Sequence, residues 1–417
     1  MDATAEHLPD DREFFATAEL LVSLAKALHH AGFASPVIED RIQRAAAVLG
    51  ARLEMLSLPT GMLLTVYRGR EPLTYAIRER PGTVNLERMK LLIKTADALI
   101  AQTLEPAAAK TRIDEIIRLP VRWGSAATVA GYVASGGAFA VFFGGGTKEV
   151  LVAVIVGLAA GIFAIFLGRG RANPRIFELA AATSATAIAG LADRVFGSFV
   201  EWIPVAAGLI ILLPGISLID AVSELSLGHL VSGASRLAGV GVVFLALTFG
   251  AVVGSAVAEL APHASDKIES QPPAEWWVFP ALAVVSLGSM IRFHARWSDL
   301  SAIFAASVVA LFAAKFGTAV LGNYIGPFVG ALLLGLAASV FSRIRNWTPE
   351  IVIIPGLALL VPGSIGVRSL SLLLSEDTAV AIQAAFLMFL IAMELVAGLL
   401  FSQALLPERR DAGVGAN

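Results

Sequence analysis

The pattern of apolar and charged positions changes at about residue 120. Charged residues recur throughout 1–120, whereas 124–143 and 237–258 contain no Asp, Glu, Lys or Arg. Because a helix that crosses a bilayer needs about 20 predominantly apolar residues, such segments predict membrane spans. We therefore predict a cytoplasmic head at 1–120, a first membrane repeat at 121–265, and a second membrane repeat with a short cytoplasmic tail at 266–417.

Helical and strand patterns alternate within the head. Apolar residues recur at helical spacing over 13–30, and Ser35 is placed to cap a second helix that Gly50 ends. Three short apolar segments separated by Pro and Gly follow, which is typical of a small β-meander. The predicted elements are helices at 13–30, 36–49, 85–103 and 106–118 and strands at 53–58, 62–67 and 73–77. The predicted class of the head is α+β.

The body contains about ten segments that are long and apolar enough to be read as spans, in two groups of five. They lie at 124–143, 149–168, 176–196, 199–218, 236–259, 276–293, 299–315, 318–341, 350–366 and 379–403. Loops on the side of the head, which include Arg236 and Arg296, hold roughly twice as many lysines and arginines as the opposite loops, which include Lys315, and this bias predicts cytoplasmic termini. The predicted fold class is a multi-pass α-helical membrane protein.

Pro-Gly pairs interrupt two apolar stretches. Pro214-Gly215 ends the fourth segment, and Pro355-Gly356 and Pro362-Gly363 lie in the ninth. Proline removes a backbone donor and glycine weakens a helix, so the freed peptide groups must face protein or water rather than lipid. Matching interruptions in two halves point to the site of a transporter, and five helices per half predict inverted repeats around it. The alternative is that Pro and Gly are simply commoner in membrane helices.

Composition agrees with a membrane body and excludes several functions. The chain is 57% hydrophobic and 15% charged with a mean hydropathy of +0.77, whereas soluble proteins are about half apolar and a quarter charged. A net charge of -2 gives no basis for a nucleic-acid partner. The absence of cysteine excludes disulfides, thiolate metal sites and a cysteine nucleophile. The N-terminus lacks signal-peptide features, so the head is expected in the cytoplasm.

A series of short matches resembles the bacterial threonine/serine exporter family. The matching positions are Leu28 to Gly32, Ser35, Glu39, Leu49-Gly50, Leu58 to Thr60, Arg78, Gly82, Asn85-Leu86 and both Pro-Gly stretches. The likeness spans nearly the whole chain and depends on the order and spacing of many positions. It implies a soluble N-terminal domain fused to a ten-helix body that exports threonine and serine from bacteria across the plasma membrane.

Charges inside a bilayer are costly, so each one is a functional candidate. Glu394 is the clearest, because no other charge occurs from 378 to 406. It is either a proton-coupling carboxylate or a carboxyl satisfied by neighbouring helices. Asp220 and Glu224 share a helix face, and they either bind a substrate ammonium group or belong to an interfacial amphipathic helix.

Other polar or irregular positions complete the candidate substrate path. Asn323 and Tyr324 precede a third irregular point and could hydrogen-bond a small polar solute, whereas Arg368 follows the second break and would favour an anion. The candidate set is Pro214, Gly215, Asp220, Glu224, Asn323, Tyr324, Pro355, Gly356, Pro362, Gly363 and Arg368.

The chain lacks a Walker A motif, so the proton gradient rather than ATP is the expected energy source. We expect neither a cofactor nor a metal. Glycines such as those of Gly250-Ala-Val-Val-Gly254 predict close helix packing within the monomer, with a homo-oligomer as the alternative.

The leading interpretation is a proton-driven secondary transporter that exports threonine and serine, with small-molecule substrate, protons and lipid as partners. Relatives with the two halves of this pattern in separate proteins are associated with dicarboxylate export, so a succinate-like substrate is the first alternative. A membrane-anchored hydrolase is the second, because His29, Ser35, Glu39 and Asn85 are residue types that hydrolases use. Ordinary structural roles for these four residues are the competing interpretation. A head that gates or regulates the body, or that passes substrate to it, fits equally well.

Overall fold

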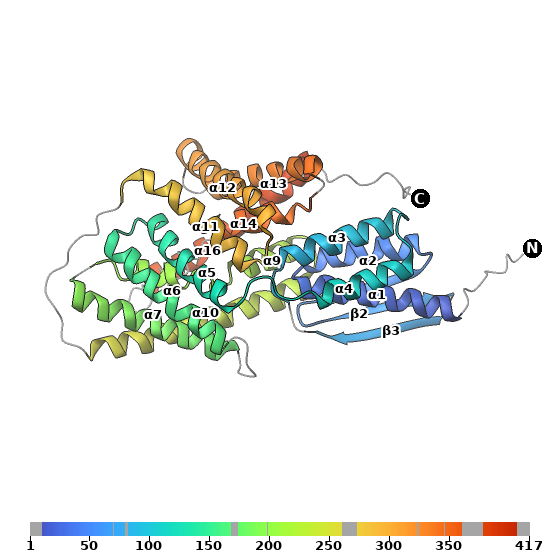
Figure 1. Cartoon of the computed structure of the whole chain (residues 1–417), viewed down its shortest axis with the longest axis horizontal. Helices are drawn as coiled ribbons and strands as arrows, with labels where there is room; N and C mark the ends of the chain where they lie inside the picture. The colour runs from blue at the N-terminus through green and yellow to red at the C-terminus, as the bar shows by residue number, and fades with distance from the viewer. Residues whose placement is uncertain are drawn as a thin grey trace, which may run out of the picture.

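A computed structural model describes residues 11–69, 71–79, 82–167, 174–197, 199–260, 273–322, 325–345, 347–360 and 378–406. The molecule is elongated, with the head (residues 11–118) at one end and the remaining helices, here called the body, at the other (Figure 1). The short helices α9 and α14 lie where the two parts meet (Figure 1).

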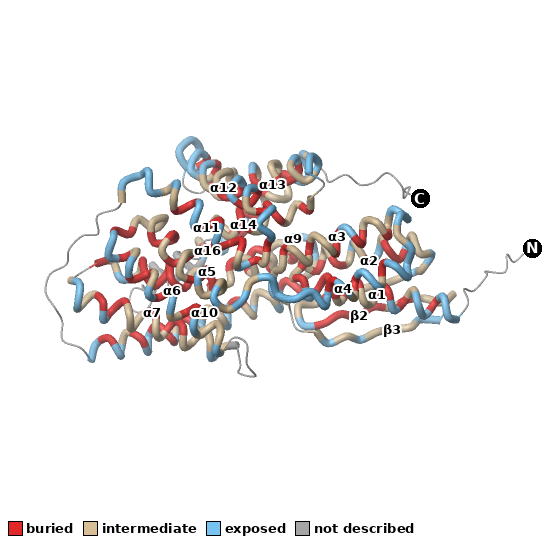
Figure 2. Tube along the Cα trace, viewed as in Figure 1, coloured by how far each residue is buried: buried red, intermediate tan, exposed pale blue. Residues whose placement is uncertain are grey.

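Each helix and strand predicted for the head has a counterpart whose ends differ by only a few residues. The helices are α1 (Asp11–Ala31), α2 (Ser35–Val48), α3 (Leu86–Ile100) and α4 (Pro106–Arg118), and the strands are β1 (Arg52–Leu58), β2 (Gly61–Arg68) and β3 (Glu71–Arg78). The strands form an antiparallel sheet in the order β1-β2-β3. Met62, Leu64 and Val66 of β2 are buried, whereas Leu63 between them is 44% exposed, as period-two alternation requires. Figure 2 shows β2 as the most buried strand drawn there.

The prediction that Ser35 caps α2 is wrong. Ala34 is the N-cap, no side chain caps the helix, and Ser35 is its first residue, followed by Pro36. The Ser35 hydroxyl pairs with Ser232 of the body at 2.9 Å instead. A tertiary contact has replaced the local one.

Seven helices of the described residues are long and apolar enough to span a membrane. They are α5 (Ser125–Phe142), α6 (Thr147–Phe166), α7 (Pro174–Phe196), α10 (Leu230–Glu259), α12 (Leu300–Leu321), α13 (Gly326–Arg345) and α16 (Thr378–Leu405). Four shorter helices accompany them, namely α8 (Trp202–Gly208), α9 (Gly215–Ser226), α11 (Val278–Arg292) and α14 (Glu350–Leu360).

The shorter helices correspond to three of the ten predicted spans. The segment 199–218 is not one helix, because α8 ends at Gly208 and α9 begins only at Gly215. The segments 276–293 and 350–366 contain α11 of 15 residues and α14 of 11 residues, and residues 361–366 lie outside the described part of the chain. A count of ten spans therefore stays a prediction.

The boundary predicted between the seventh and eighth spans is wrong. Helix α12 continues to Leu321 and stops at Gly322, whose φ of 95° favours glycine, so Lys315 lies inside a helix rather than in a loop.

Close packing in the body depends on glycine. A Cβ at Gly250 of α10 would lie 2.6 Å from the carbonyl oxygen of Leu179 in α7, and one at Gly254 would collide with the carbonyl oxygen of Thr183. The GxxxG pattern thus allows two helices of one chain to touch, which is the use predicted for it. By contrast, a Cβ at Gly239 or Gly241 of the same helix would meet open space.

Helices at corresponding positions of the two halves make corresponding contacts. In the first half α5 packs on α6, α6 on α7 and α8, and α7 on α10. In the second half α11 packs on α12, α12 on α13 and α14, and α13 on α16. Helices α5 and α11, the first of each half, pack on one another.

Candidate functional site

A cavity of about 530 Å³ lies between the head and the body. Head residues form one wall and six helices of the body contribute to the others. The head residues are His29, Gly32, Phe33, Pro59, Gly82, Thr83 and Val84, and the polar or ionisable residues of the body are Thr128, Tyr132, Ser135, Glu178, Ser217, Asp220, Arg236, Ser289, Arg292 and His294. The size suits a small polar solute with some of its water.

The first Pro-Gly break lines this cavity. All residues from Ile210 to Ser217 contact it, and the backbone there is non-helical between the end of α8 and the start of α9. Pro214 is the N-cap of α9, with φ and ψ of -80° and 44°. The N-terminus of a helix carries unsatisfied N–H groups and a partial positive charge, so this end of α9 can attract an anionic group. Irregular backbone at this depth faces a cavity, as the sequence argument required.

Four charged side chains of opposite signs line the cavity. Asp220 and Glu178 supply carboxylates, and Arg236 and Arg292 supply guanidinium groups. Asp220 Oδ2 lies 3.8 Å from Arg236 Nη1, and Glu178 pairs with Arg175 at 2.9 Å. The cavity therefore presents acceptors for a cation and donors for an anion at the same time.

Glu224 lies beside the cavity and joins the head to the body. The carboxylate is fully buried and accepts hydrogen bonds from Arg236 Nη2 at 2.9 Å, Arg236 Nε at 3.2 Å and the Ser232 hydroxyl at 2.8 Å. Its fourth donor is the backbone N–H of Ser35, 3.2 Å away, in the first turn of α2. A charge taken out of water needs such complete pairing.

His29 faces the cavity from the head and is 5% exposed. Burial lowers the pKa of His29 below its ordinary value of 6.5, with His30 acting in the same direction. The side chain hydrogen-bonds the backbone of Pro59, and Nε2 is buried without a hydrogen-bond partner among the described residues. A neutral imidazole is therefore the form that the cavity favours.

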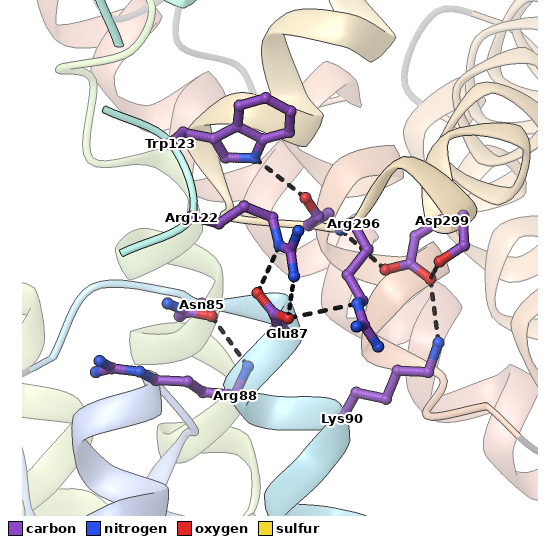
Figure 3. Close-up of polar contacts among 10 residues, drawn as sticks. Asn85, Glu87, Arg88, Lys90, Arg122, Trp123, Arg296 and Asp299 are labelled. Carbon is purple, nitrogen blue, oxygen red and sulfur yellow. Dashed lines mark hydrogen bonds and ion pairs between the residues drawn. The ribbon is translucent and has the colours of Figure 1, made fainter. Parts of the chain in front are cut away.

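A second set of polar contacts ties α3 to the body (Figure 3). Glu87 accepts hydrogen bonds from Arg122 at 2.5 and 2.7 Å and lies 3.4 Å from Arg296. Hydrogen bonding to Arg122 holds the pKa of Glu87 below its ordinary value. Lys90 Nζ lies 3.1 Å from the fully buried carboxylate of Asp299.

Backbone groups strengthen this second contact. The N–H of Leu86 donates to the carbonyl of Phe293 at 2.8 Å, and the indole N–H of Trp123 donates to the carbonyl of Ala295 at 3.1 Å. The segment that joins the head to the body is therefore fixed where it enters the body.

The four residues named for a hydrolase have separate tasks. Asn85 caps α3 by accepting a hydrogen bond from the N–H of Arg88 at 3.0 Å. Glu39 accepts one from the N–H of Ser57 at 2.7 Å and lies 3.6 Å from His229. Ser35 is held by Ser232 and Glu224, and His29 lines the cavity. These contacts account for three of the four residues by structural roles.

Only some of the predicted substrate-path residues line the cavity. Pro214, Gly215 and Asp220 line the cavity, and Glu224 contacts it through Arg236. Pro355 and Gly356 are buried in α14, one turn before the lining residues Ala358 and Leu359. Asn323, Tyr324, Pro362, Gly363 and Arg368 lie outside the described residues.

Glu394 lies in α16, which packs on α13 and α9, and is not among the residues that line the cavity. Its Oε2 is buried without a hydrogen-bond partner in the described part of the chain. Among the residues that the structure describes, no group of three His, Cys, Asp or Glu could hold a metal ion.

Sequence reasoning missed Arg236, Tyr132 and Arg292 as site residues. Arg236 was assigned to a loop that orients the chain, but α10 begins at Leu230 and places it in the second turn of a membrane helix. The signal in the sequence is its spacing of 12 residues from Glu224, because two helices joined by a tight turn can bring such positions together.

Apolar helices around a cavity with both signs of charge, with irregular backbone between α8 and α9 in its wall, are typical of the membrane bodies of transporters. A family model described as "Putative threonine/serine exporter" matches residues 19–258 and 261–406. The chain belongs to this family.

Three relatives illustrate the range of the family. A threonine/serine exporter of Corynebacterium glutamicum is 22% identical over 332 residues, which cover 76% of this chain and 67% of that protein. An uncharacterized protein of Schizosaccharomyces pombe is 24% identical over 369 residues, 84% of this chain and 47% of its own. Pheromone-regulated membrane protein 10 of Candida albicans is 24% identical over 373 residues, 86% of this chain and 33% of its own.

The chain thus spans half or less of the length of these two fungal relatives. No solved structure matches the chain.

Proposed function

We propose that this transporter exports threonine and serine through the cavity between the head and the body. The observation that carries the proposal is the pairing of Asp220 and Arg236 at the first helix break, in a cavity with both signs of charge. A neutral amino acid has an ammonium group for Asp220 and a carboxylate for Arg236 and the N-terminus of α9. The exporter of Corynebacterium glutamicum supports the choice of substrate by its name alone.

The balance of charge argues against a dicarboxylate as the preferred substrate. Both carboxylates of succinate would need cationic partners, and the cavity offers Arg236 and Arg292. Asp220 lies 3.8 Å from Arg236, so the second carboxylate of a dicarboxylate bound at Arg236 would be repelled by Asp220, whereas an ammonium group would pair with it. The zwitterion fits this arrangement better.

Proton coupling is assigned to Glu394. A carboxyl whose oxygen is buried without a hydrogen-bond partner can take up a proton at that atom without first giving up a donor or a cation. Helix α16 packs on α9, so a change at Glu394 can reach the segment that carries Asp220.

We place the chain in a bacterial plasma membrane with both termini in the cytoplasm. Charge bias assigns Arg236 and Arg296 to the cytoplasmic side. Arg296 lies 3.4 Å from Glu87 of the head, and Arg236 holds Glu224, which accepts a hydrogen bond from Ser35 of the head. That agreement supports the orientation. The corresponding helix contacts of the two halves likewise support two five-helix, inverted repeats.

An efflux assay in proteoliposomes tests the proposal. Vesicles loaded with labelled threonine, serine or succinate are compared with and without an imposed pH gradient. We expect gradient-dependent efflux of threonine and serine, with succinate much slower. Fast succinate efflux with no threonine efflux would replace the amino acid by a dicarboxylate, and transport of none of the three would contradict the proposal.

A further inference from the structure

The head closes one side of the cavity. His29, Phe33, Pro59 and Val84 form its wall on that side, and the irregular segment around Pro214 belongs to the wall formed by the body. A solute that enters the cavity from the side of the head must therefore pass head residues.

Two groups of polar contacts hold the head in place, and they differ in their distance from the segment that joins head and body. Glu87 is tied to Arg122, which lies in the segment that joins head and body. Lys90 and Leu86 of the same helix also contact Asp299 and Phe293 of the body. These contacts lie beside the segment that joins head and body, so this region is the pivot of a rotation of the head. Ser35 and Glu224 are 189 positions apart and far from the joining segment, so this contact forms only when the head is docked on the body.

The contact at Ser35 is also the one connected to the cavity. Arg236 holds Glu224 through Nε and Nη2, while its Nη1 is directed at Asp220, 3.8 Å away on the cavity wall. Arg236 lines the cavity, whereas Glu224 is not among the residues that line it. The guanidinium group of Arg236 therefore faces the cavity at Asp220 and also holds the carboxylate that contacts the head.

A carboxylate that enters the cavity competes for this guanidinium. Bidentate pairing with a carboxylate is the strongest interaction that arginine makes, and Glu224 now occupies it. When a second carboxylate takes part of that pairing, Glu224 loses its main counter-charge. A buried carboxylate without its cation is strongly destabilised, so it will move towards water and leave the N–H of Ser35.

We propose that the head is the gate of the cavity and that Ser35, Ser232, Glu224 and Arg236 are its latch. The carboxylate of the substrate opens the latch by exchanging with Glu224 on Arg236, and the head then swings about the contact of Glu87 with Arg122 and Arg296. This inference depends on the proposed transport through the cavity. It assigns a function to the head that requires no catalytic chemistry.

A disulfide across the latch tests the gate directly, because the chain has no cysteine of its own. The hydroxyl oxygens of Ser35 and Ser232 are 2.9 Å apart, so the double variant Ser35→Cys/Ser232→Cys should cross-link on mild oxidation. We expect loss of threonine efflux from oxidised proteoliposomes and its recovery on reduction. The single variants should not respond to the oxidant.

A matched pair within the head controls for the chemistry. The hydroxyl oxygens of Thr65 and Thr74 are also 2.9 Å apart, but they link β2 to β3 and leave the head free to move. Oxidation of Thr65→Cys/Thr74→Cys should leave efflux unchanged. Equal efflux from the oxidised and reduced latch variant would overturn the gate.

The rate of cross-linking tests the exchange at Arg236. Saturating threonine should slow disulfide formation between residues 35 and 232 and leave that of the control pair unaltered. An unchanged rate would remove Arg236 as the link between substrate and latch, and failure to cross-link at all would contradict the docked contact. If the reduced latch variant and the unmodified chain both fail to transport threonine, the proposed function is at fault and not the gate.

Discussion

The backbone N–H of Ser35 donates a hydrogen bond to Glu224 at 3.2 Å and so joins the first turn of a head helix to a buried carboxylate of the body. The N-terminus of a helix favours a negative charge, and here the charge comes from another part of the same chain. The interaction makes the head a wall of the cavity instead of a separate appendage.

Removing the guanidinium of Arg236 should destabilise the protein. Arg236→Ala leaves Glu224 buried without its cation, at a cost of about 3–5 kcal/mol. Thermal unfolding of the purified protein in detergent measures this loss. The double variant Arg236→Met/Glu224→Gln should recover most of the stability without recovering threonine efflux, and a double variant as unstable as Arg236→Ala would contradict the pairing.

Asp220→Asn should weaken the handling of amino acids with little effect on stability, because Glu224 keeps Arg236 paired. Loss of one charge-assisted contact to an ammonium group is expected to raise KM for threonine by about tenfold. Asp114→Asn, which alters an exposed pair with Lys110 on the head, serves as control and should leave KM unchanged. An unaltered KM in Asp220→Asn would remove Asp220 from the substrate site.

Glu394→Gln should abolish the effect of a pH gradient on efflux while threonine exchange between the two sides continues. A glutamine keeps the shape of the side chain and cannot exchange a proton. Glu259→Gln at the exposed end of α10 is the control, and it should retain the gradient effect. A full gradient effect in Glu394→Gln would exclude it as the coupling group.

Glu87 should make the head contact weaker in acid. Arg122 lowers the pKa of Glu87 below its ordinary value of 4.5, so the stabilisation is present above that value and is lost as the pH falls through the lowered pKa. Unfolding measured at decreasing pH should show a steeper loss of stability in the unmodified chain than in Glu87→Gln. The exposed residue Glu13, changed to Gln, should leave the slope unaltered.

Glycines of one helix should differ sharply in their tolerance of alanine. Gly254→Ala pushes a methyl group against the backbone of α7 and is expected to cost about 1–3 kcal/mol. Gly241→Ala meets open space in the same helix and should be neutral or slightly stabilising. Equal unfolding temperatures for the two variants would contradict the packing of α7 on α10.

The sequence by itself determined the helices and strands of residues 11–118, seven of the ten predicted spans as helices long and apolar enough to cross a membrane, and the break at Pro214-Gly215. These features follow from local rules, since periodicity, apolar length and the missing donor of proline act within a few residues. The likeness to threonine/serine exporters depended on many short matches in order, and the family match bears it out.

Only the tertiary structure decided which polar residues meet. From the sequence, Ser35 is interpreted as a helix cap and Arg236 as a loop charge, because nothing local indicates that both contact Glu224. Their positions depend on the pairing of the buried Glu224 carboxylate with groups that include Ser35, 189 positions away in the sequence, and no local pattern indicates this pairing.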